Sequence, residues 1–136
     1  MALLSQPTLN LISDKLVSVE ADGKPALIGG RCAACSTLSF PRAEICPTCL
    51  SEKVEAIHLS SEGELYSYTV VHQASKNWNV PYVLGYVDLP EGIRVLAHID
   101  ASVSALVINQ KVTLSLGVVG FDAAGAAVST YTFVPA

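Results

Sequence analysis

Two Cys-x-x-Cys pairs contain every cysteine of the 136-residue chain: Cys32, Cys35, Cys46 and Cys49. Each pair brings two thiolates to one side of a tight turn, and two such turns that face each other make a tetrahedral four-sulfur metal site. This is the spacing of a zinc ribbon, so we expect a structural zinc ion held by these four thiolates. Because four thiolates leave no coordination position for water, we expect no catalysis at this metal.

Three other uses of the cysteines are considered. A redox centre needs one Cys-x-x-Cys beside a βαβ pattern, and no such pattern flanks either pair. Structural disulfides are rare in the cytoplasm, where we place this chain. Iron in a rubredoxin-like site suits the same ligands, and the sequence does not choose between iron and zinc. Glycine often follows the second cysteine of such a turn, but Ser36 and Leu50 stand there instead.

Charge and hydropathy argue against several classes of protein. The formal net charge is −4, whereas a nucleic-acid-binding domain usually carries a basic stripe. No run of the sequence approaches the about 20 apolar residues that span a bilayer. The first residues, MALLSQPTLNLISDKLVS, lack a basic segment followed by a long apolar run, so they are a poor signal peptide. We therefore predict a cytoplasmic protein that binds neither nucleic acid nor membrane.

The first half of the sequence divides into two parts. Residues 1–26 are predicted to form an N-terminal arm or short helix, because a partial helical periodicity ends at ADGKP. The apolar residues with this periodicity are Leu9, Leu11, Ile12 and Leu16. Residues 27–60 are predicted to form a rubredoxin-like zinc ribbon, with strands at ALIGGRC, at Thr37–Phe40 and at VEAIHLS. A turn at Pro41 returns the chain to the second cysteine pair.

Residues 61–136 have the pattern of an all-β domain, so the fold class is mainly β. Five segments are rich in β-branched and aromatic residues: ELYSYTVVH, YVLGYVDL, IRVLAHID, VTLSLGVV and VSTYTFV. In the fourth segment, one face is shared by Val112, Leu114, Leu116 and Val118. Five strands in about 75 residues fit a closed OB-fold barrel, with a helical turn or a loop in DASVSALVINQ. Gly85 and Gly117 mark either bends of the barrel or only the loss of a side chain.

The loop QASKNWNVPY, residues 73–82, carries the most suggestive side chains apart from the cysteines. Its Trp78 is the single tryptophan of the sequence, and an exposed tryptophan is a favoured interface anchor. Lys76 is suited to meet a phosphate group of a ligand. Tyr82 and Arg94 are weaker candidates for the same ligand or partner surface. The alternative is that Trp78 folds back over the mouth of the barrel.

Catalysis by this chain alone is not expected. Catalysis by a thiol needs a cysteine nucleophile that is activated by a neighbouring base, and all four cysteines are assigned to the metal. His58, His72 and His98 are scattered along the chain, without a cysteine or serine partner in a recognisable motif. We therefore assign no catalytic residue.

Five segments together are specific enough to indicate a family: RCAAC, FPRAEICPTC, EGELYSYTVVH, VPYVLGYVDLPEGIRVLAHI and YTFVP. Through them the chain resembles, from residue 27 to 134, the zinc-ribbon–OB-fold family of acyl-CoA-associated proteins. Besides Ser36 and Leu50, it departs from the family at VINQKV, where a glycine is common near Asn109. Members of the family are small subunits of thiolases and thiolase-like aldolases. The resemblance implies an accessory subunit of such an enzyme, with aromatic and steroid degradation among the family's settings.

Three functions are compatible with these observations. The first is a non-catalytic subunit that orders the active site of a thiolase-type enzyme or helps to hold acyl-CoA. The second is a free-standing acyl-CoA-binding module, which would bind CoA esters without a partner. The third, and the least supported, is a nucleic-acid-binding OB domain, whose affinity would fall steeply with salt.

Overall fold

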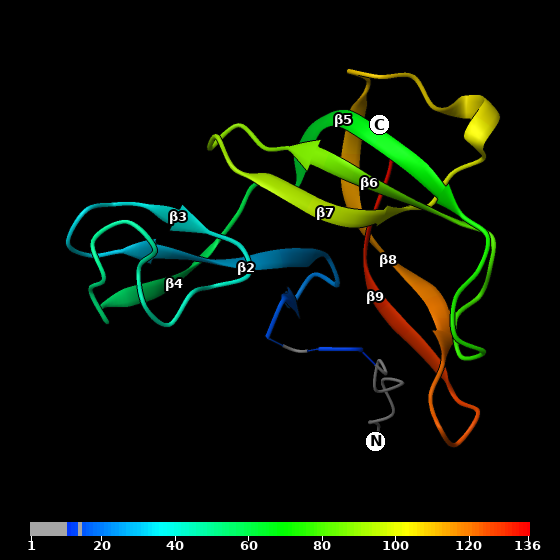
Figure 1. The fold of residues 1–136 in the computed structure, drawn as a ribbon, viewed down its shortest axis with the longest axis horizontal. Helices are drawn as coiled ribbons and strands as arrows, with labels where there is room; N and C mark the ends of the chain where they lie inside the picture. The colour runs from blue at the N-terminus through cyan, green and yellow to red at the C-terminus, as the bar shows by residue number, and fades with distance from the viewer. Residues whose placement is uncertain (1–10, 14) are drawn as a thin grey trace.

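The computed structural model describes residues 11–13 and 15–136, and the regular structure of these residues is almost entirely β. The elements are β1 (Val17–Val19), β2 (Pro25–Cys32), β3 (Leu38–Ser39), β4 (Val54–His58), β5 (Glu62–Val71), β6 (Tyr82–Asp88), β7 (Arg94–Ile99), the short 3₁₀ helix η1 (Val103–Ala105), β8 (Lys111–Phe121) and β9 (Ala127–Pro135). Figure 1 shows a small sheet of β1–β4 beside a barrel of β5–β9. In the described part of the chain, no helix is long and apolar enough to cross a membrane.

The barrel confirms the predicted five-stranded OB-type domain. Its strands close in the order β5-β6-β7-β9-β8, and every neighbouring pair is antiparallel except β7 with β9. Alternate residues of β6 and β7 are buried, which is the pattern of strands with one face on a core. The core includes Val87, Val95, Val112 and Phe133, each with 0% of its surface exposed. Of the two alternatives expected in DASVSALVINQ, a helical turn or a loop, the structure has the helical turn, η1.

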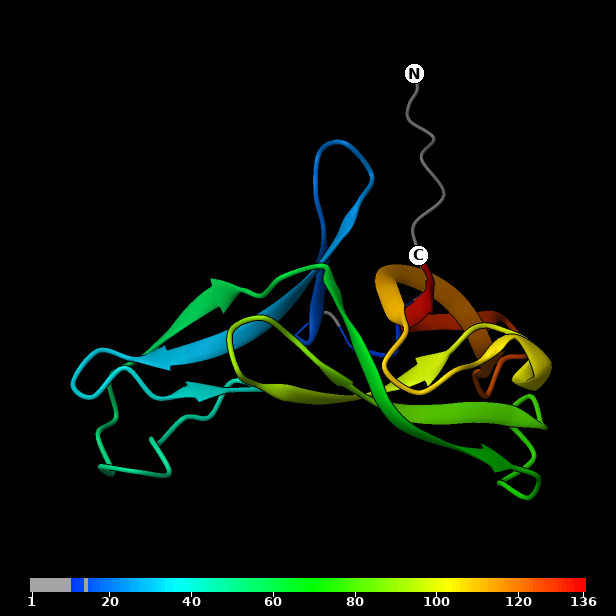
Figure 2. The same cartoon turned by 90° about the horizontal axis from the view of Figure 1, so that it is seen from above.

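Strand β2 is the centre of the small sheet. β4 pairs with residues 28–32 of β2, β3 pairs with residues 30–31, and β1 pairs with residues 25–27, all in antiparallel register. The strand predicted at Thr37–Phe40 is shorter than expected, since only Leu38–Ser39 pair with β2. The hairpin that joins β1 to β2 projects away from the rest of the molecule (Figure 2).

The N-terminal segment was predicted as an arm or a short helix, and its described residues form no helix. Strand β1 and the start of β2 lie there instead. Val17 pairs with Leu27 across the hairpin, and its side chain is only 1% exposed. This burial of Val17 stabilises the strand more than a weak helical periodicity stabilises a helix. Of the residues with helical periodicity, Leu9 lies outside the described residues.

The ribbon sheet and the barrel share one hydrophobic core. Leu27 of β2 and Leu59, which follows β4, are buried in the same cluster as Phe133 of β9. The backbone N–H of Leu59 donates to the carbonyl of Leu27 over 2.9 Å, so the two ribbon segments enter the core together. At the edge of this cluster Phe40 packs edge-on against Tyr131, with ring centroids 5.6 Å apart. The small sheet is therefore held against the barrel by buried apolar contacts.

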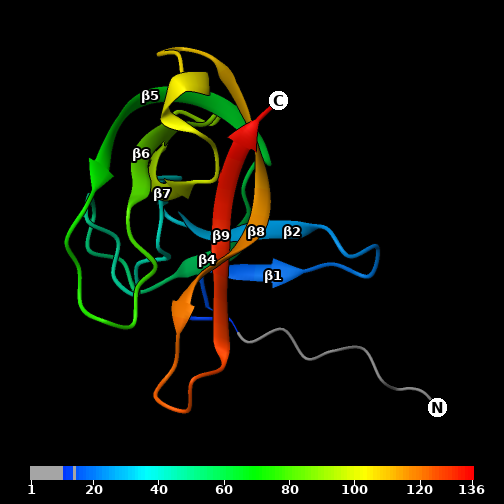
Figure 3. The same ribbon diagram turned by 90° about the vertical axis from the view of Figure 1, so that its right-hand side faces the viewer.

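Strands β8 and β9 extend past the barrel as a two-stranded hairpin (Figures 1 and 3). Val112 and Leu114 lie in the core, whereas Val118, further along β8, is 56% exposed. The apolar face predicted for this strand is therefore buried only in the first part of β8. A β-bulge follows, because the register with β9 shifts between Val118 and Gly120.

The bulge in β8 lies against the loop between β5 and β6, residues 72–81. The N–H of Asn79 donates to the Val119 carbonyl over 3.0 Å, and the N–H of Phe121 donates to the Asn77 carbonyl over 2.8 Å. A Cβ atom on Gly120 would lie only 2.0 Å from the Asn77 carbonyl oxygen. Gly120 is thus required because two backbones approach each other closely here.

Three residues that are not glycine have a left-handed backbone: Ser36 with φ 66°, Leu50 with φ 64° and Asn109 with φ 72°. These are the positions where glycine was expected by analogy with zinc-ribbon turns or with the family. Ser36 and Leu50 close the two cysteine turns, since their N–H groups donate to the carbonyls of Cys32 and Cys46. The backbone has therefore kept the conformation that glycine favours, although a side chain makes it less stable.

Replacing Gly120 by alanine should displace the 72–81 loop from β8. The added methyl group overlaps the Asn77 carbonyl, so we expect a loss of about 1–3 kcal/mol in the free energy of unfolding. Chemical denaturation measures this loss, and the emission of Trp78, the single tryptophan, reports on the loop. The control Val118→Ala removes an exposed side chain nearby and should change stability by less than about 0.5 kcal/mol. An unchanged stability and Trp78 spectrum in Gly120→Ala would contradict the close approach.

Replacing Leu50 by glycine should stabilise the second cysteine turn. Leu50 is 74% exposed, so little packing is lost when its side chain is removed. The left-handed conformation costs a residue with a Cβ about 1–2 kcal/mol, and part of this cost is recovered with glycine. Thermal unfolding at a fixed metal concentration should show a higher midpoint for Leu50→Gly than for Leu50→Ala, which retains the Cβ. Equal midpoints would show that the turn is not strained.

Candidate functional site

The four cysteines converge at the end of the ribbon sheet. Their Sγ atoms all lie within 4.8 Å of one another, with 3.5 Å between Cys32 and Cys49 and 3.5 Å between Cys35 and Cys46. A tetrahedral ion with Zn–S bonds of about 2.3 Å requires sulfur atoms about 3.8 Å apart. A disulfide, in contrast, requires about 2.05 Å, and the four thiols are free. The geometry therefore fits a metal ion better than a crosslink.

Backbone N–H groups in the two turns favour the thiolate form of two cysteines. The N–H of Cys35 is the main cause that lowers the pKa of Cys32. In the second turn the N–H of Cys49 lowers the pKa of Cys46 to about 6. The N–H of Ala34 also approaches Cys32 Sγ, at 3.4 Å. Hydrogen bonds to a thiolate favour the charged form, which is the form that binds a metal.

Ionisation of Cys49 is unfavourable and requires a nearby cation. The N–H of Ser51 lowers the pKa of Cys49, but hydrogen bonding with Cys32 and Cys35 outweighs this effect, and the pKa of Cys49 is raised to about 12. Four thiolates can therefore exist together at neutral pH only around a positive ion. The donor set thus fits a divalent metal, and its four sulfurs fill a tetrahedron. The residues suit a closed metal site, which would hold structure and would have no free position for a substrate.

The loop between β5 and β6 brings Trp78 and Tyr82 together with a residue from β7. His98 stacks on Trp78 with ring centroids 5.7 Å apart and an interplanar angle of 11°, and on Tyr82 at 4.6 Å and 29°. Trp78 is half-buried, so the structure supports the alternative in which it folds back on the barrel. Lys76 lies in the same loop and is exposed. We call Trp78, Tyr82 and His98 the aromatic stack.

The position of His98 follows from the register of two strands. Tyr82 and Leu84 lie on the same face of β6, and His98 of β7 stands opposite Leu84. Its diagonal neighbour on that face is Tyr82, at the end of the loop. Burial lowers the pKa of His98, so the imidazole is neutral at neutral pH. Sequence reasoning treated His98 as scattered because a pairing between strands cannot be read from one segment.

Arg94 does not join the aromatic stack. It stands opposite Asp88 at the other end of β7, four residues or about 13 Å from His98. Its Nε and Nη2 donate to the Asp88 carboxylate over 2.6 and 3.1 Å, and its guanidinium lies 3.5 Å from the centre of the Tyr66 ring. The hydrogen bond with Arg94 lowers the pKa of Asp88. Arg94 therefore has partners on its own surface, apart from Lys76, Trp78 and Tyr82.

The other two histidines lie at separate places. His58 Nδ1 is 3.1 Å from a carboxylate oxygen of Glu20, and His72 is exposed. Among residues 11–13 and 15–136, no hydrogen bond joins a histidine to a cysteine or a serine. The described residues thus contain no pair of nucleophile and base of the kind that acyl transfer requires.

Two family models match consecutive parts of the chain. Residues 20–55 match the model described as the rubredoxin-like zinc ribbon domain of ChsH2. Residues 56–117 match the model described as the C-terminal OB-fold domain of ChsH2. The first contains the four cysteines, and the second contains the aromatic stack.

Similar proteins carry names connected with thiolases and aldolases. The benzoylsuccinyl-CoA thiolase subunit BbsA of Thauera aromatica is 33% identical over 129 residues, which are 94% of this chain and 90% of that protein. A DUF35 domain-containing scaffold protein of Methanocaldococcus jannaschii is 45% identical over 76 residues, which are 54% of each protein. A solved structure described as the Ltp2-ChsH2(DUF35) aldolase is 29% identical with a TM-score of 0.65, covering 81% of this chain and 84% of that one.

The likeness covers both parts of the fold and nearly the full length of one relative. It includes the cysteine turns as well as the barrel, so it extends to the metal site. The chain therefore belongs to the ChsH2 family, in which a rubredoxin-like zinc ribbon precedes an OB-fold domain.

Proposed function

We propose that this chain is a non-catalytic subunit of a thiolase-type acyl-CoA enzyme and that its ribbon is held by a structural zinc ion. The observation that carries this proposal is the closed four-cysteine site: every thiol is used to hold structure, which leaves no thiol for acyl transfer. The names of the relatives agree with an accessory role. One is a thiolase subunit, one is a scaffold protein, and one is a component of an aldolase.

The site residues have separate roles in this proposal. Cys32, Cys35, Cys46 and Cys49 are the zinc ligands, and the ion would cross-link the two turns that end the ribbon sheet. Cytoplasmic conditions suit this role, because a reducing compartment keeps the thiols available to the metal. Zinc is favoured over iron because the family's ribbon domain is named for it, while four thiolates suit either metal.

Acyl-CoA binding by this chain itself is the second candidate function. The observation in its favour is that Lys76 is exposed in the loop that also carries Trp78, so a phosphate could approach a positive charge there. The aromatic stack is closed by its own rings, however, and offers no open slot between them. We therefore rank binding of a CoA ester below binding of the enzyme. The net charge of −4 places nucleic acid last.

Purification of the tagged chain from its native host should bring a thiolase-like enzyme with it. Mass spectrometry of the purified complex is expected to show this enzyme in a fixed ratio to the chain, and the complex should persist on size-exclusion chromatography. The matched test is calorimetric titration of the isolated chain with acetyl-CoA, which should give no saturable binding. A chain that purifies alone under gentle conditions, and whose acetyl-CoA binding is lost in Lys76→Ala, would instead establish the free-standing binder.

Replacing Cys46 by serine should remove the metal and destabilise the ribbon. We expect one zinc per chain in the wild type and less than a tenth as much in Cys46→Ser, because one of four thiolate ligands is lost. Elemental analysis after dialysis measures the metal, and thermal unfolding measures stability. Thr48→Ala is the control, since it changes the same turn and leaves all four thiols in place. One tightly held zinc per chain in Cys46→Ser would contradict the four-ligand site, and iron in the wild type would contradict zinc.

A further inference from the structure

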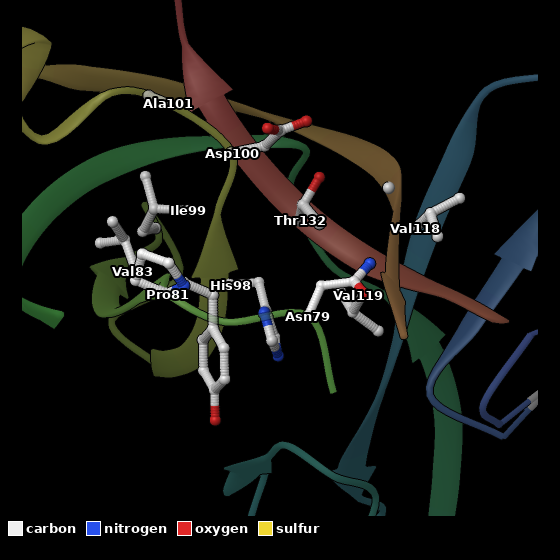
Figure 4. A pocket seen from close by; sticks show the side chains of 12 residues that line it. Asn79, Pro81, Val83, His98, Ile99, Asp100, Ala101, Val118, Val119 and Thr132 are labelled. Carbon is white, nitrogen blue, oxygen red and sulfur yellow. The ribbon is translucent and has the colours of Figure 1, made fainter. Parts of the chain in front are cut away.

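A cavity of about 220 Å³ lies where the 72–81 loop meets the ends of β7 and the faces of β8 and β9. Figure 4 shows its lining, in which five side chains carry polar groups. These are Asn79 from the loop, Tyr82 from the start of β6, His98 and Asp100 from the end of β7, and Thr132 from β9. Polar groups from three separated segments of the chain therefore converge on one space.

Thr132 is the unusual member of this lining. Its side chain is almost fully buried, at 2% exposed, and its hydroxyl oxygen Oγ1 has no hydrogen-bond partner in the described part of the chain. Buried hydroxyl groups nearly always have a partner, because an unpaired one costs about 1–3 kcal/mol. In Figure 4 this hydroxyl points toward Asp100. The group that satisfies Thr132 therefore lies beyond the described residues, and a water molecule or a ligand atom can supply it.

Gly117 of β8 keeps this space open. A Cβ atom built on it would contact Thr132 Cγ2 at 3.0 Å and would lie 3.5 Å from Thr132 Oγ1 and 3.6 Å from Asp100 Oδ2. Gly117 therefore adjoins both the buried hydroxyl and the carboxylate. A side chain at position 117 would narrow the space beside them. The sequence suggested a bend or a missing side chain at Gly117, and here the missing side chain leaves room for a ligand atom.

The charge of the cavity favours a cation with several N–H donors. Asp100 is its one ionisable acid, and none of the eight lysines and arginines of the sequence lines it. Two of the three arginines bind elsewhere, Arg94 to Asp88 and Arg42 to the carbonyl of Val54. Thr132 Oγ1, the Asp100 carboxylate and the Asn79 amide oxygen are all able to accept hydrogen bonds. The neutral imidazole of His98 adds another acceptor.

The size and shape of the cavity favour one planar side chain. Pockets that enclose a whole small-molecule ligand measure about 300–1,000 Å³, so about 220 Å³ is too small for a nucleotide or an acyl-CoA. Tyr82 and His98, whose rings stack on each other, both line the cavity. A guanidinium group is planar, carries five donors in a fixed fork and stacks on aromatic faces. An ammonium group offers only three donors around a point charge.

We propose that this cavity receives an arginine side chain of the partner enzyme. Asp100 accepts hydrogen bonds from the guanidinium at the cavity mouth, the Thr132 hydroxyl accepts one inside, and Tyr82 and His98 line the same cavity. This inference rests on the proposed function, because the arginine belongs to the thiolase-type enzyme that the chain binds. It makes the loop and the ends of β7 and β9 part of the interface between the two proteins.

The first experiment tests the chemistry of the cavity in the chain alone. Amide chemical shifts in NMR spectra would be followed while N-acetyl-arginine amide is added, with the lysine and citrulline amides as matched probes. Citrulline has the shape of arginine and no charge. We expect saturable shifts around Asn79, His98 and Thr132 with arginine, and binding that is about tenfold weaker with the other two. Equal binding of arginine and citrulline, or no saturable shift with arginine, would overturn the guanidinium site.

The second experiment tests the interface in the complex. Asp100→Asn removes the charge, Thr132→Val removes the hydroxyl at nearly constant shape, and Gly117→Ala fills the space between them. Each should weaken the binding of the enzyme about tenfold, measured by biolayer interferometry. Glu64→Gln is the control, because it removes an exposed carboxylate of the barrel outside the cavity. Asp100→Asn changes an exposed residue, so this variant should fold normally. It therefore keeps the test valid even if the Gly117→Ala variant does not fold.

The two experiments separate this inference from the proposed function. If the wild type binds the enzyme and all three variants bind equally well, the inference is wrong and the proposed function stands. A weaker complex without binding of the arginine probe would show that the cavity matters for another reason, and would overturn the guanidinium assignment. If the wild type binds no enzyme, the proposed function is wrong, and so is the assignment of the arginine to a partner enzyme. The probe titration would still decide whether the cavity accepts a guanidinium group.

Discussion

Four thiolates cannot share a space less than 5 Å across without a positive charge among them, and the ribbon is arranged around this constraint. Backbone N–H groups lower the pKa of Cys32 and Cys46, whereas hydrogen bonding with Cys32 and Cys35 raises the pKa of Cys49. Binding of a metal ion would compensate for bringing the two turns together, and on our proposal folding of this end is coupled to it. The two cysteine turns flank the segment that carries Phe40, and Phe40 packs against Tyr131 of the barrel.

The barrel contributes a different kind of order. Its core is apolar and closed, so its strands need no ion to stay in register. On its outer surface, the 72–81 loop is fastened to β8 by backbone hydrogen bonds and to β7 through the stacking of Trp78 on His98. A loop held at two sides keeps a defined shape before any partner arrives. Such preorganisation lowers the entropic cost of binding.

The sequence was sufficient for features that depend on local spacing. The cysteine turns, the five barrel strands and the turn at η1 could all be predicted, because each is encoded within a short segment. It was insufficient where distant segments meet. The stacking of His98 on Trp78 depends on strand register, and the need for Gly120 depends on a loop more than forty residues earlier in the chain. The helical periodicity near the N-terminus misled because Val17 gains more from pairing with β2.

The course of β2 has a consequence for how the protein can be divided. One end of this strand carries Cys32 in the metal site, and Leu27, five residues before it, has no exposed surface within the core that includes Phe133. The two family models meet at residue 56, inside β4, yet the two matched segments bury side chains against each other. A chain cut there would expose Leu27 on one fragment and the core around Phe133 on the other. Burial of a leucine contributes about 1.5–3 kcal/mol, so each fragment would lose part of the packing that stabilises the intact chain.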